Sequence, residues 1–217
     1  MIDYKRTQKE LYLPKATPSV VDVPEMAFIM VDGRGNPNSA ESYHTAIEIL
    51  YGLSYAIKMS KKGGCEPEGY FDYAVPPLEG LWWLADDSAH SDNPDSPDDS
   101  AYLDKDKYCW TAMIRQPEFV TQDVFGAAKT ALAKKKPKLD PARARLELFT
   151  EGLCAQVMHI GPYDDEPATI AMLHRFISDS GYHEDISETR RHHEIYLSNP
   201  LKTAPEKCKT VLRYPVK

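Results

Sequence analysis

Residues 26–31 read Met26-Ala27-Phe28-Ile29-Met30-Val31, an uninterrupted apolar run of the kind that forms a buried strand. A glycine-containing loop over 32–37 follows, and apolar residues then recur at helical spacing from about 39 to 61. The same order returns later as an apolar strand over 153–160, a Gly-Pro turn and a helix over 165–180. The offset is about 130 residues, which predicts an architectural repeat within the chain.

Each half continues with further strands and reads strand-helix-strand-strand. The other predicted strands cover 19–23, 70–84 (interrupted by Pro76-Pro77), 108–115, 145–149, 192–197 and 210–214. In such a half, the single helix covers one face of the sheet and leaves the other face free. We therefore expect an α+β fold in which two pseudo-twofold-related modules of antiparallel sheet, with helices on one face, surround a central cleft between the free faces.

The chain is expected to form a single domain over residues 1–217. Module one covers about 18–117, a connector helix covers about 121–136, and module two covers about 143–217. Residues 86–106 are rich in Asp, Ser and Pro and are expected to form a long hairpin loop, either a lid over a site or a solvated loop.

The segment His192-His193-Glu194-Ile195-Tyr196-Leu197 places a carboxylate in a short strand. Side chains alternate along a strand, so Ile195 and Leu197 share an apolar face, while His192, Glu194 and Tyr196 share the other. A carboxylate taken out of water needs a partner or a raised pKa. Glu194 is therefore a candidate catalytic residue if its face lines a cleft, with Tyr196 beside it as a candidate proton donor.

Strands that border the expected cleft carry aromatic residues and one more carboxylate. All three tryptophans of the chain lie in the first half. The candidate ligand-binding residues are Trp82, Trp83, Trp110, Tyr70, Tyr73, Tyr108, Glu79 and His192. Core packing is the alternative for each aromatic. Trp82 and Trp83 are adjacent and face opposite sides, so at most one lines the cleft unless a bulge intervenes.

Composition narrows the classes of partner. The net charge of −7 disfavours a nucleic-acid binder, and no apolar run is long enough to cross a membrane. The N-terminus lacks the apolar core of a signal peptide, so we expect a cytoplasmic monomer or homodimer that binds a small molecule. The four cysteines show no C-x-x-C spacing and the histidines no converging metal-ligand pattern, so no metal or other cofactor is expected. Phosphate-binding glycine motifs and a G-x-S-x-G motif are absent.

Three stretches together resemble the GyrI-like small-molecule-binding domain family. Residues 151–163, ending His159-Ile160-Gly161-Pro162-Tyr163, resemble its H-x-G-P-Y strand and turn. Residues 192–200 resemble its second-half pocket strand, and 77–83 resemble the matching first-half segment of a stand-alone subgroup. Segments 116–120 and 209–213 also fit, so the resemblance covers about 18–217.

The resemblance implies two strand-helix-strand-strand modules around a cleft that binds aromatic, often cationic, organic molecules, with Glu194 as the pocket acid. The subgroup is similar to cyclopropanoid hydrolases, which open the strained ring of DNA-alkylating natural products inside an aromatic cage. We therefore expect xenobiotic detoxification by hydrolysis, in which Glu194 activates water and Tyr196 donates to the carbonyl. The alternative is a non-catalytic, multidrug-binding protein in which Glu194 is the counter-ion of a cation. A protein-interaction role for the acidic 86–106 segment is a third hypothesis.

Overall fold

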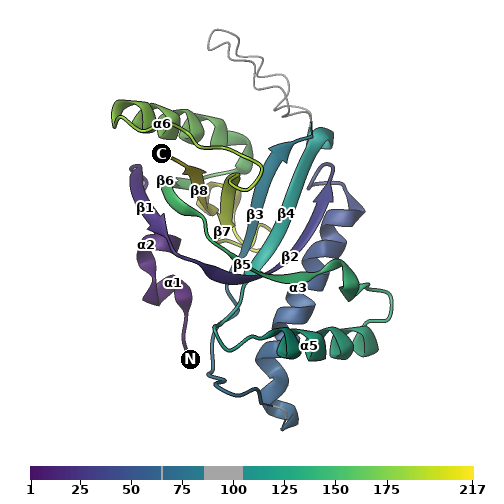
Figure 1. The fold of residues 1–217 in the computed structure, drawn as a ribbon. Helices are drawn as coiled ribbons and strands as arrows, with labels where there is room; N and C mark the ends of the chain where they lie inside the picture. The colour runs from purple at the N-terminus through teal and green to yellow at the C-terminus, as the bar shows by residue number, and fades with distance from the viewer. Residues whose placement is uncertain (65, 86–104) are drawn as a thin grey trace.

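A computed structural model describes residues 1–64, 66–85 and 105–217; most of the predicted loop over 86–106 lies outside these residues. One antiparallel sheet of eight strands organises the chain, in the order β1-β6-β8-β7-β3-β4-β2-β5 (Figure 1). The strands are β1 Ser19–Val23, β2 Met26–Arg34, β3 Leu78–Leu84, β4 Tyr108–Arg115, β5 Arg145–Phe149, β6 Gly152–Ile160, β7 His192–Tyr196 and β8 Lys209–Pro215.

In the residues that the structure describes, five α-helices flank the sheet: α1 Tyr4–Thr7, α2 Lys9–Tyr12, α3 Glu41–Met59, α5 Gln122–Lys135 and α6 Glu166–Asp179. Short 3₁₀ turns cover Ser60–Gly63, Lys105–Lys107, Pro141–Arg143, Tyr163–Asp165 and Pro205–Lys207. No helix in the described part of the chain is long and apolar enough to cross a membrane.

The strand order has the predicted pseudo-twofold symmetry. Exchanging β1 with β5, β2 with β6, β3 with β7 and β4 with β8 reproduces the same order in reverse. The two modules meet where β3 pairs with β7, and there Gly80 lies opposite Glu194. Each module also gives its first strand to the other, because β1 pairs with β6 and β5 pairs with β2. This exchange of edge strands was not expected from the sequence.

Helices α3 and α5 cover one face of module one, where Ile29, Val31 and Ile114 pack against Ile49 and Leu53. On module two, α6 packs Leu173 and Ile177 onto strand residues such as Val157 and Leu212. These two clusters lie on the outer strands of each half, so the central pair β3 and β7 lies between the two helix-covered regions.

The opposite face of the sheet is not free, which corrects the expected position of the cleft. Leu11 and Tyr12 of α2 pack there against Phe28, Met113 and Ile195. The two N-terminal helices thus cover part of this face, and Figure 1 shows them beside β1. Their four-residue lengths explain why periodicity did not reveal them.

Two predicted boundaries were also wrong. The strand expected over 70–84 begins only at Leu78, because Pro76 and Pro77 have no backbone N–H to give to a sheet ladder. Strand β2 continues to Arg34 through Gly33, where a turn was expected. Gly33 pairs with Trp110, and a Cβ at this position would lie 2.2 Å from the indole, so the glycine makes room for the tryptophan.

Candidate functional site

Glu194 sits at the module junction and is held by its neighbours on the same face of β7. The Tyr196 hydroxyl donates to Glu194 Oε2 at 2.7 Å, and His192 Nε2 lies 3.1 Å from Oε1. Across the junction, Trp82 Nε1 donates to the Tyr196 hydroxyl at 2.9 Å. The alternation of a strand explains this arrangement, because residues two apart point to the same side. A continuous hydrogen-bond chain therefore runs from Trp82 through Tyr196 to Glu194.

Aromatic rings from both modules surround this chain. Tyr43, in the first turns of α3, has its ring centroid 5.8 Å from that of Trp82, and Tyr108 of β4 lies 6.0 Å from the same indole. On the other side, Tyr163 lies 6.0 Å from Tyr196 in an edge-to-face arrangement. Such faces and edges suit flat aromatic molecules and cations.

The phenols at the site are proton donors at neutral pH. Burial, followed by the negative charge of Glu194, raises the pKa of Tyr196 well above its ordinary value. The same two causes raise the pKa of Tyr43. Burial, the nearby Cys208 and the acidic groups raise the pKa of Tyr163 to about 12. A developing negative charge on a ligand would thus meet hydroxyl groups that still carry their protons.

Glu194 remains reachable from solvent. Its side chain is 16% exposed and that of His192 is 13% exposed, while Trp82 and Tyr196 are half-buried. A carboxylate in this position can accept a proton from water or act as the counter-ion of a bound cation.

The structure brings five of the expected residues together, namely Glu194, Tyr196, His192, Trp82 and Tyr108. Trp110 is near but fully buried, beneath Tyr43 at a centroid distance of 4.9 Å, so it supports the cluster as core.

Tyr70 and Tyr73 lie elsewhere, which corrects their placement in the same site. The Tyr70 hydroxyl donates to the Lys58 carbonyl at 2.8 Å, and Tyr73 packs against Phe119. Lys58 and Tyr43 are fifteen residues apart on α3, so about 22 Å separates these positions along the helix.

Trp83 and Glu79 point to the opposite face, as the alternation from Trp82 requires. Trp83 packs beneath the Arg191 guanidinium, 5.0 Å from the ring centroid. Glu79 is 1% exposed, with Oε2 3.0 Å from Nε2 of the equally buried His193. Of the two adjacent tryptophans, Trp82 is therefore the one that meets the residues around Glu194, and Glu79 lies on the other face of β3.

His193 belongs to a buried ionic network behind the site. Its Nδ1 lies 3.0 Å from Glu151 Oε2, which also accepts from Arg213 Nη1 at 2.7 Å. Although burial alone would lower it, Glu151 and then Glu79 raise the pKa of His193 to about 9. Burial opposes ionisation of Glu151, but the charges of Arg213 and His193 lower its pKa to about 2.

Sequence reasoning missed three residues of the site: Tyr43, Tyr163 and Glu166. Glu166 is 7% exposed in the first turn of α6. Burial, followed by the charge of Glu194, raises its pKa to about 9. The predicted pseudo-twofold symmetry is the sequence feature that pointed to Tyr43 and Glu166, because it places the first turns of α3 and α6 near the module junction.

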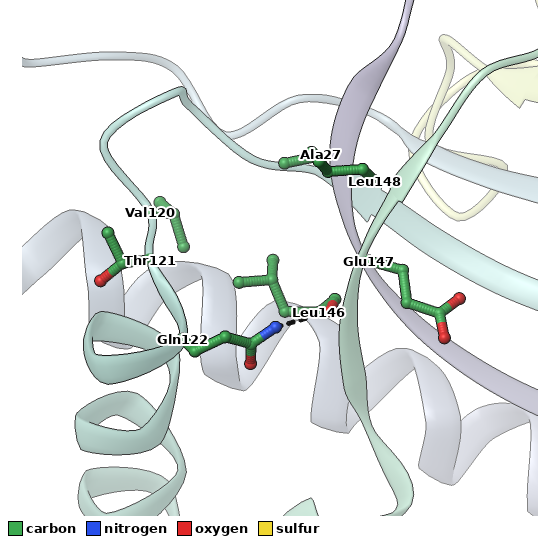
Figure 2. Close-up of a pocket in the computed structure, with 7 residues that line it drawn as sticks. All are labelled: Ala27, Val120, Thr121, Gln122, Leu146, Glu147 and Leu148. Carbon is green, nitrogen blue, oxygen red and sulfur yellow. Dashed lines mark hydrogen bonds between the residues drawn. The ribbon is translucent and has the colours of Figure 1, made fainter.

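A hollow lies apart from this cluster, between β5 and the start of α5 (Figure 2). It encloses about 230 Å³ and is lined by Ala27, Val120, Thr121, Gln122, Leu146, Glu147 and Leu148. Gln122 Nε2 crosses it to donate to the Leu146 carbonyl at 3.0 Å. Its lining is mixed, with Thr121, Gln122 and Glu147 among apolar side chains. Within the described ranges, no group of three His, Cys, Asp or Glu residues could hold a metal ion.

Comparison with known proteins gives a family match over nearly the whole chain. Residues 16–217 match the model of the GyrI-like small molecule binding domain. A hydrolase from Listeria innocua is 44% identical, with a TM-score of 0.88 and 100% of both chains covered. An uncharacterized conserved protein from Listeria innocua is 45% identical, with a TM-score of 0.89 and the same coverage.

Likeness to the C-terminal domain of EcmrR shows the fold alone. It is 12% identical, with a TM-score of 0.50 over 93% of this chain and 97% of that one. None of the curated proteins matches the chain.

Proposed function

This chain belongs to the GyrI-like small-molecule-binding family, and we propose that it binds flat aromatic xenobiotics at Glu194 and hydrolyses cyclopropanoid alkylating agents there. The observation that carries the proposal is the hydrogen-bond chain from Trp82 through Tyr196 to a solvent-reachable Glu194. The 44% identity to a hydrolase from Listeria innocua supports the hydrolytic class.

The reaction adds one water to the ligand. Glu194 takes a proton from a water molecule as its oxygen attacks the unsubstituted cyclopropane carbon. The ring C–C bond breaks, and its electron pair moves through the conjugated system to the carbonyl oxygen. That oxygen gains a proton from the Tyr196 hydroxyl, which is hydrogen-bonded to Glu194, and becomes a phenol. Glu194 returns its proton to the tyrosine, which leaves the protein unchanged.

Strain in the cyclopropane ring supplies driving force for its opening, so the protein needs only to position the ligand and to provide one general base. General-base assistance contributes roughly 100- to 10,000-fold to a rate. Aromatic contacts from Trp82, Tyr43 and Tyr163 hold the ligand plane beside the base.

The test is incubation with a duocarmycin-type cyclopropanoid followed by mass spectrometry. We expect a product heavier by one water, with turnover falling by roughly 100-fold or more in Glu194→Gln. The matched control is Glu147→Gln, whose carboxylate is 51% exposed on β5 and pairs with Arg145. Equal turnover in Glu194→Gln and wild type would refute the assignment of the base.

Binding without catalysis is the second candidate, and the aromatic rings around Glu194 favour it equally. Here the cyclopropanoid would be recovered intact with the protein. Glu194→Gln would then weaken cationic ligands and spare neutral ligands of the same shape.

A further inference from the structure

His159 is a buried histidine that joins two segments of module two. It lies on β6 and is 4% exposed. Its Nδ1 lies 2.8 Å from the Thr169 hydroxyl oxygen in the first turn of α6, and its Nε2 lies 3.0 Å from the Pro162 carbonyl oxygen. A carbonyl oxygen only accepts hydrogen bonds, so Nε2 carries a proton, and in the neutral ring Nδ1 accepts from the hydroxyl. Both ring nitrogens are thus engaged inside the protein.

The Pro162 carbonyl belongs to the turn that carries Tyr163. It also accepts the backbone N–H of Asp165 at 3.0 Å, which closes the 3₁₀ turn Tyr163–Asp165. The chain enters this turn through Gly161, whose φ of +149° favours glycine. A Cβ at Gly161 would lie 3.3 Å from His159 Nε2, so the backbone passes close to the imidazole. The imidazole therefore fastens the turn to the sheet.

Tyr163 is the part of the candidate site that this turn positions. Its ring lies edge-to-face with Tyr196 at a centroid distance of 6.0 Å, and the Tyr196 hydroxyl donates to Glu194. Tyr163 is 37% exposed, so burial of its own ring does little to fix it. Its place beside Tyr196 depends on the backbone of the turn, and the turn depends on His159.

The sheet places His159 in line with the residues of the site. His159 pairs with Thr210 on β8, and Thr210 pairs with Tyr196 on β7. Side chains of residues paired across a sheet lie on the same face, so these three form one row on the face that α6 covers. The histidine and Tyr196 thus share one rigid support.

Module one has a counterpart of this arrangement. Strands β2 and β6 both contain nine residues, and Gly33 occupies the position in β2 that His159 occupies in β6. Gly33 pairs with Trp110, whose indole lies beneath Tyr43 at a centroid distance of 4.9 Å. Each module thus uses a buried ring at this pair of positions to support the tyrosine that it contributes to the site.

We propose that His159 is the positioning residue for Tyr163: its hydrogen bond to the Pro162 carbonyl holds the Tyr163 ring beside Tyr196 as one wall for a flat aromatic ligand. The ligand-binding part of this role rests on the proposed function. His159 takes no part in the proton transfers, so its loss should weaken binding and leave the chemical step at Glu194 unchanged. An aromatic contact corresponds to about 2- to 12-fold in binding, and such a change appears in KM rather than in kcat.

Two substitutions separate the two hydrogen bonds of the imidazole. The amide of Gln reaches the place of Nε2, so His159→Gln keeps the bond to Pro162 and loses the bond to Thr169, whereas His159→Asn does the reverse. With the duocarmycin-type cyclopropanoid as substrate, His159→Asn should raise KM about 2- to 12-fold with kcat within about twofold of wild type. His159→Gln should restore the wild-type KM. The control His183→Asn changes an exposed histidine and should leave both constants unchanged.

A double-mutant cycle tests whether His159 acts through Tyr163. Tyr163→Ala should raise KM by itself, and His159→Asn should then add no further rise. Effects of the two substitutions that multiply would overturn the proposal, and so would equal KM values in wild type and His159→Asn. An equal rise in His159→Gln and His159→Asn would also overturn it, because it would show a general packing role. In each of these cases the proposed function would stand.

Fluorine NMR of protein labelled with 3-fluorotyrosine measures the position of the Tyr163 ring without a ligand. The Tyr163 signal is the one that disappears in Tyr163→Phe. It should keep its wild-type chemical shift in His159→Gln and move toward that of the free amino acid in His159→Asn, and an unchanged shift in His159→Asn would refute the positioning role. If wild type neither binds nor hydrolyses the cyclopropanoid, the proposed function falls and the fluorine signal alone decides the role of His159.

Discussion

Replacing Glu166 with Gln should stabilise the protein at neutral pH, although the residue is buried and lies in the candidate site. Its pKa is raised from 4.5 to about 9 by burial and by Glu194. The unfolded chain releases this proton above pH 4.5, whereas the folded protein retains it. The stability associated with Glu166 is therefore fully present below pH 4.5 and is lost as the pH rises toward 9.

The magnitude follows from the same values. At pH 7 the solution is about 2.5 pH units above 4.5, the pKa of this group in the unfolded chain. At about 1.4 kcal/mol per unit, the folded protein loses about 3 kcal/mol of stability by keeping the proton. The amide of Gln has nearly the shape of the neutral acid and carries no such proton. Its less favourable hydrogen bonds should reduce the gain in stability by about 1 kcal/mol. Glu166→Gln should thus gain about 2 kcal/mol at pH 7 and more at pH 8, and it should be neutral or slightly destabilised at pH 4.5.

Urea denaturation of both proteins at pH 4.5, 7 and 8 measures this difference directly. Glu41→Gln is the matched control because it changes an exposed glutamate in the first turn of α3. If the stabilities of wild type and Glu166→Gln differ by the same amount at every pH, Glu166 does not carry a proton in the folded protein and the reasoning is refuted.

Three further outcomes are expected. His193 has a pKa raised to about 9, so its contribution of up to about 3 kcal/mol to stability is present below pH 6.5 and is lost as the pH rises toward 9. His193→Gln should remove this fall of the unfolding free energy with pH, measured by denaturation at several pH values. An unchanged pH dependence in the variant would contradict the prediction. Gly80→Ala places a Cβ 2.7 Å from Trp82 Nε1, so it should shift the tryptophan fluorescence and lower the stability by about 1–3 kcal/mol. The control Gly126→Ala meets open space and should raise the stability by up to about 1 kcal/mol. Equal effects of the two substitutions would argue against a fixed position of the Trp82 indole. Tyr196→Phe removes the acceptor of Trp82 and the donor to Glu194, and should lower turnover or cation affinity about tenfold, a loss that Tyr55→Phe, on an exposed tyrosine, should not reproduce.

Local patterns in the sequence were sufficient for the modules and for the centre of the site. The apolar runs at 26–31 and 153–160 and the helical stripes after them lie where they were expected, because a strand and an amphipathic helix depend on short-range spacing. The same period-two rule placed Glu194, Tyr196 and His192 on one face, and the structure confirms that these side chains meet.

What could not be predicted depends on which segment covers which face. The alternation rule separated Trp82 from Trp83 but could not say which of them meets Glu194, because that choice is made by the pairing of β3 with β7. Tyr43 and Glu166 enter the site from helices that periodicity treats only as core stripes. The N-terminal helices are too short to carry a periodic signal, so the covered concave face and its ionic network were missed.

That network provides a physical reason for the precise position of Glu194. His193 follows His192 and precedes Glu194 on β7, and it pairs across the module junction with Glu79 of β3 at 3.0 Å. A buried ion pair contributes little net stability, but breaking one costs about 3–5 kcal/mol. A slip of one residue between β3 and β7 would turn His193 toward the face covered by α3 and α6 and remove the ion pair of Glu79, while Glu194 would turn away from Tyr43. The buried ion pair of His193 and Glu79 thus opposes the alternative register, and Glu194 on the opposite face keeps its position at the junction of the two modules.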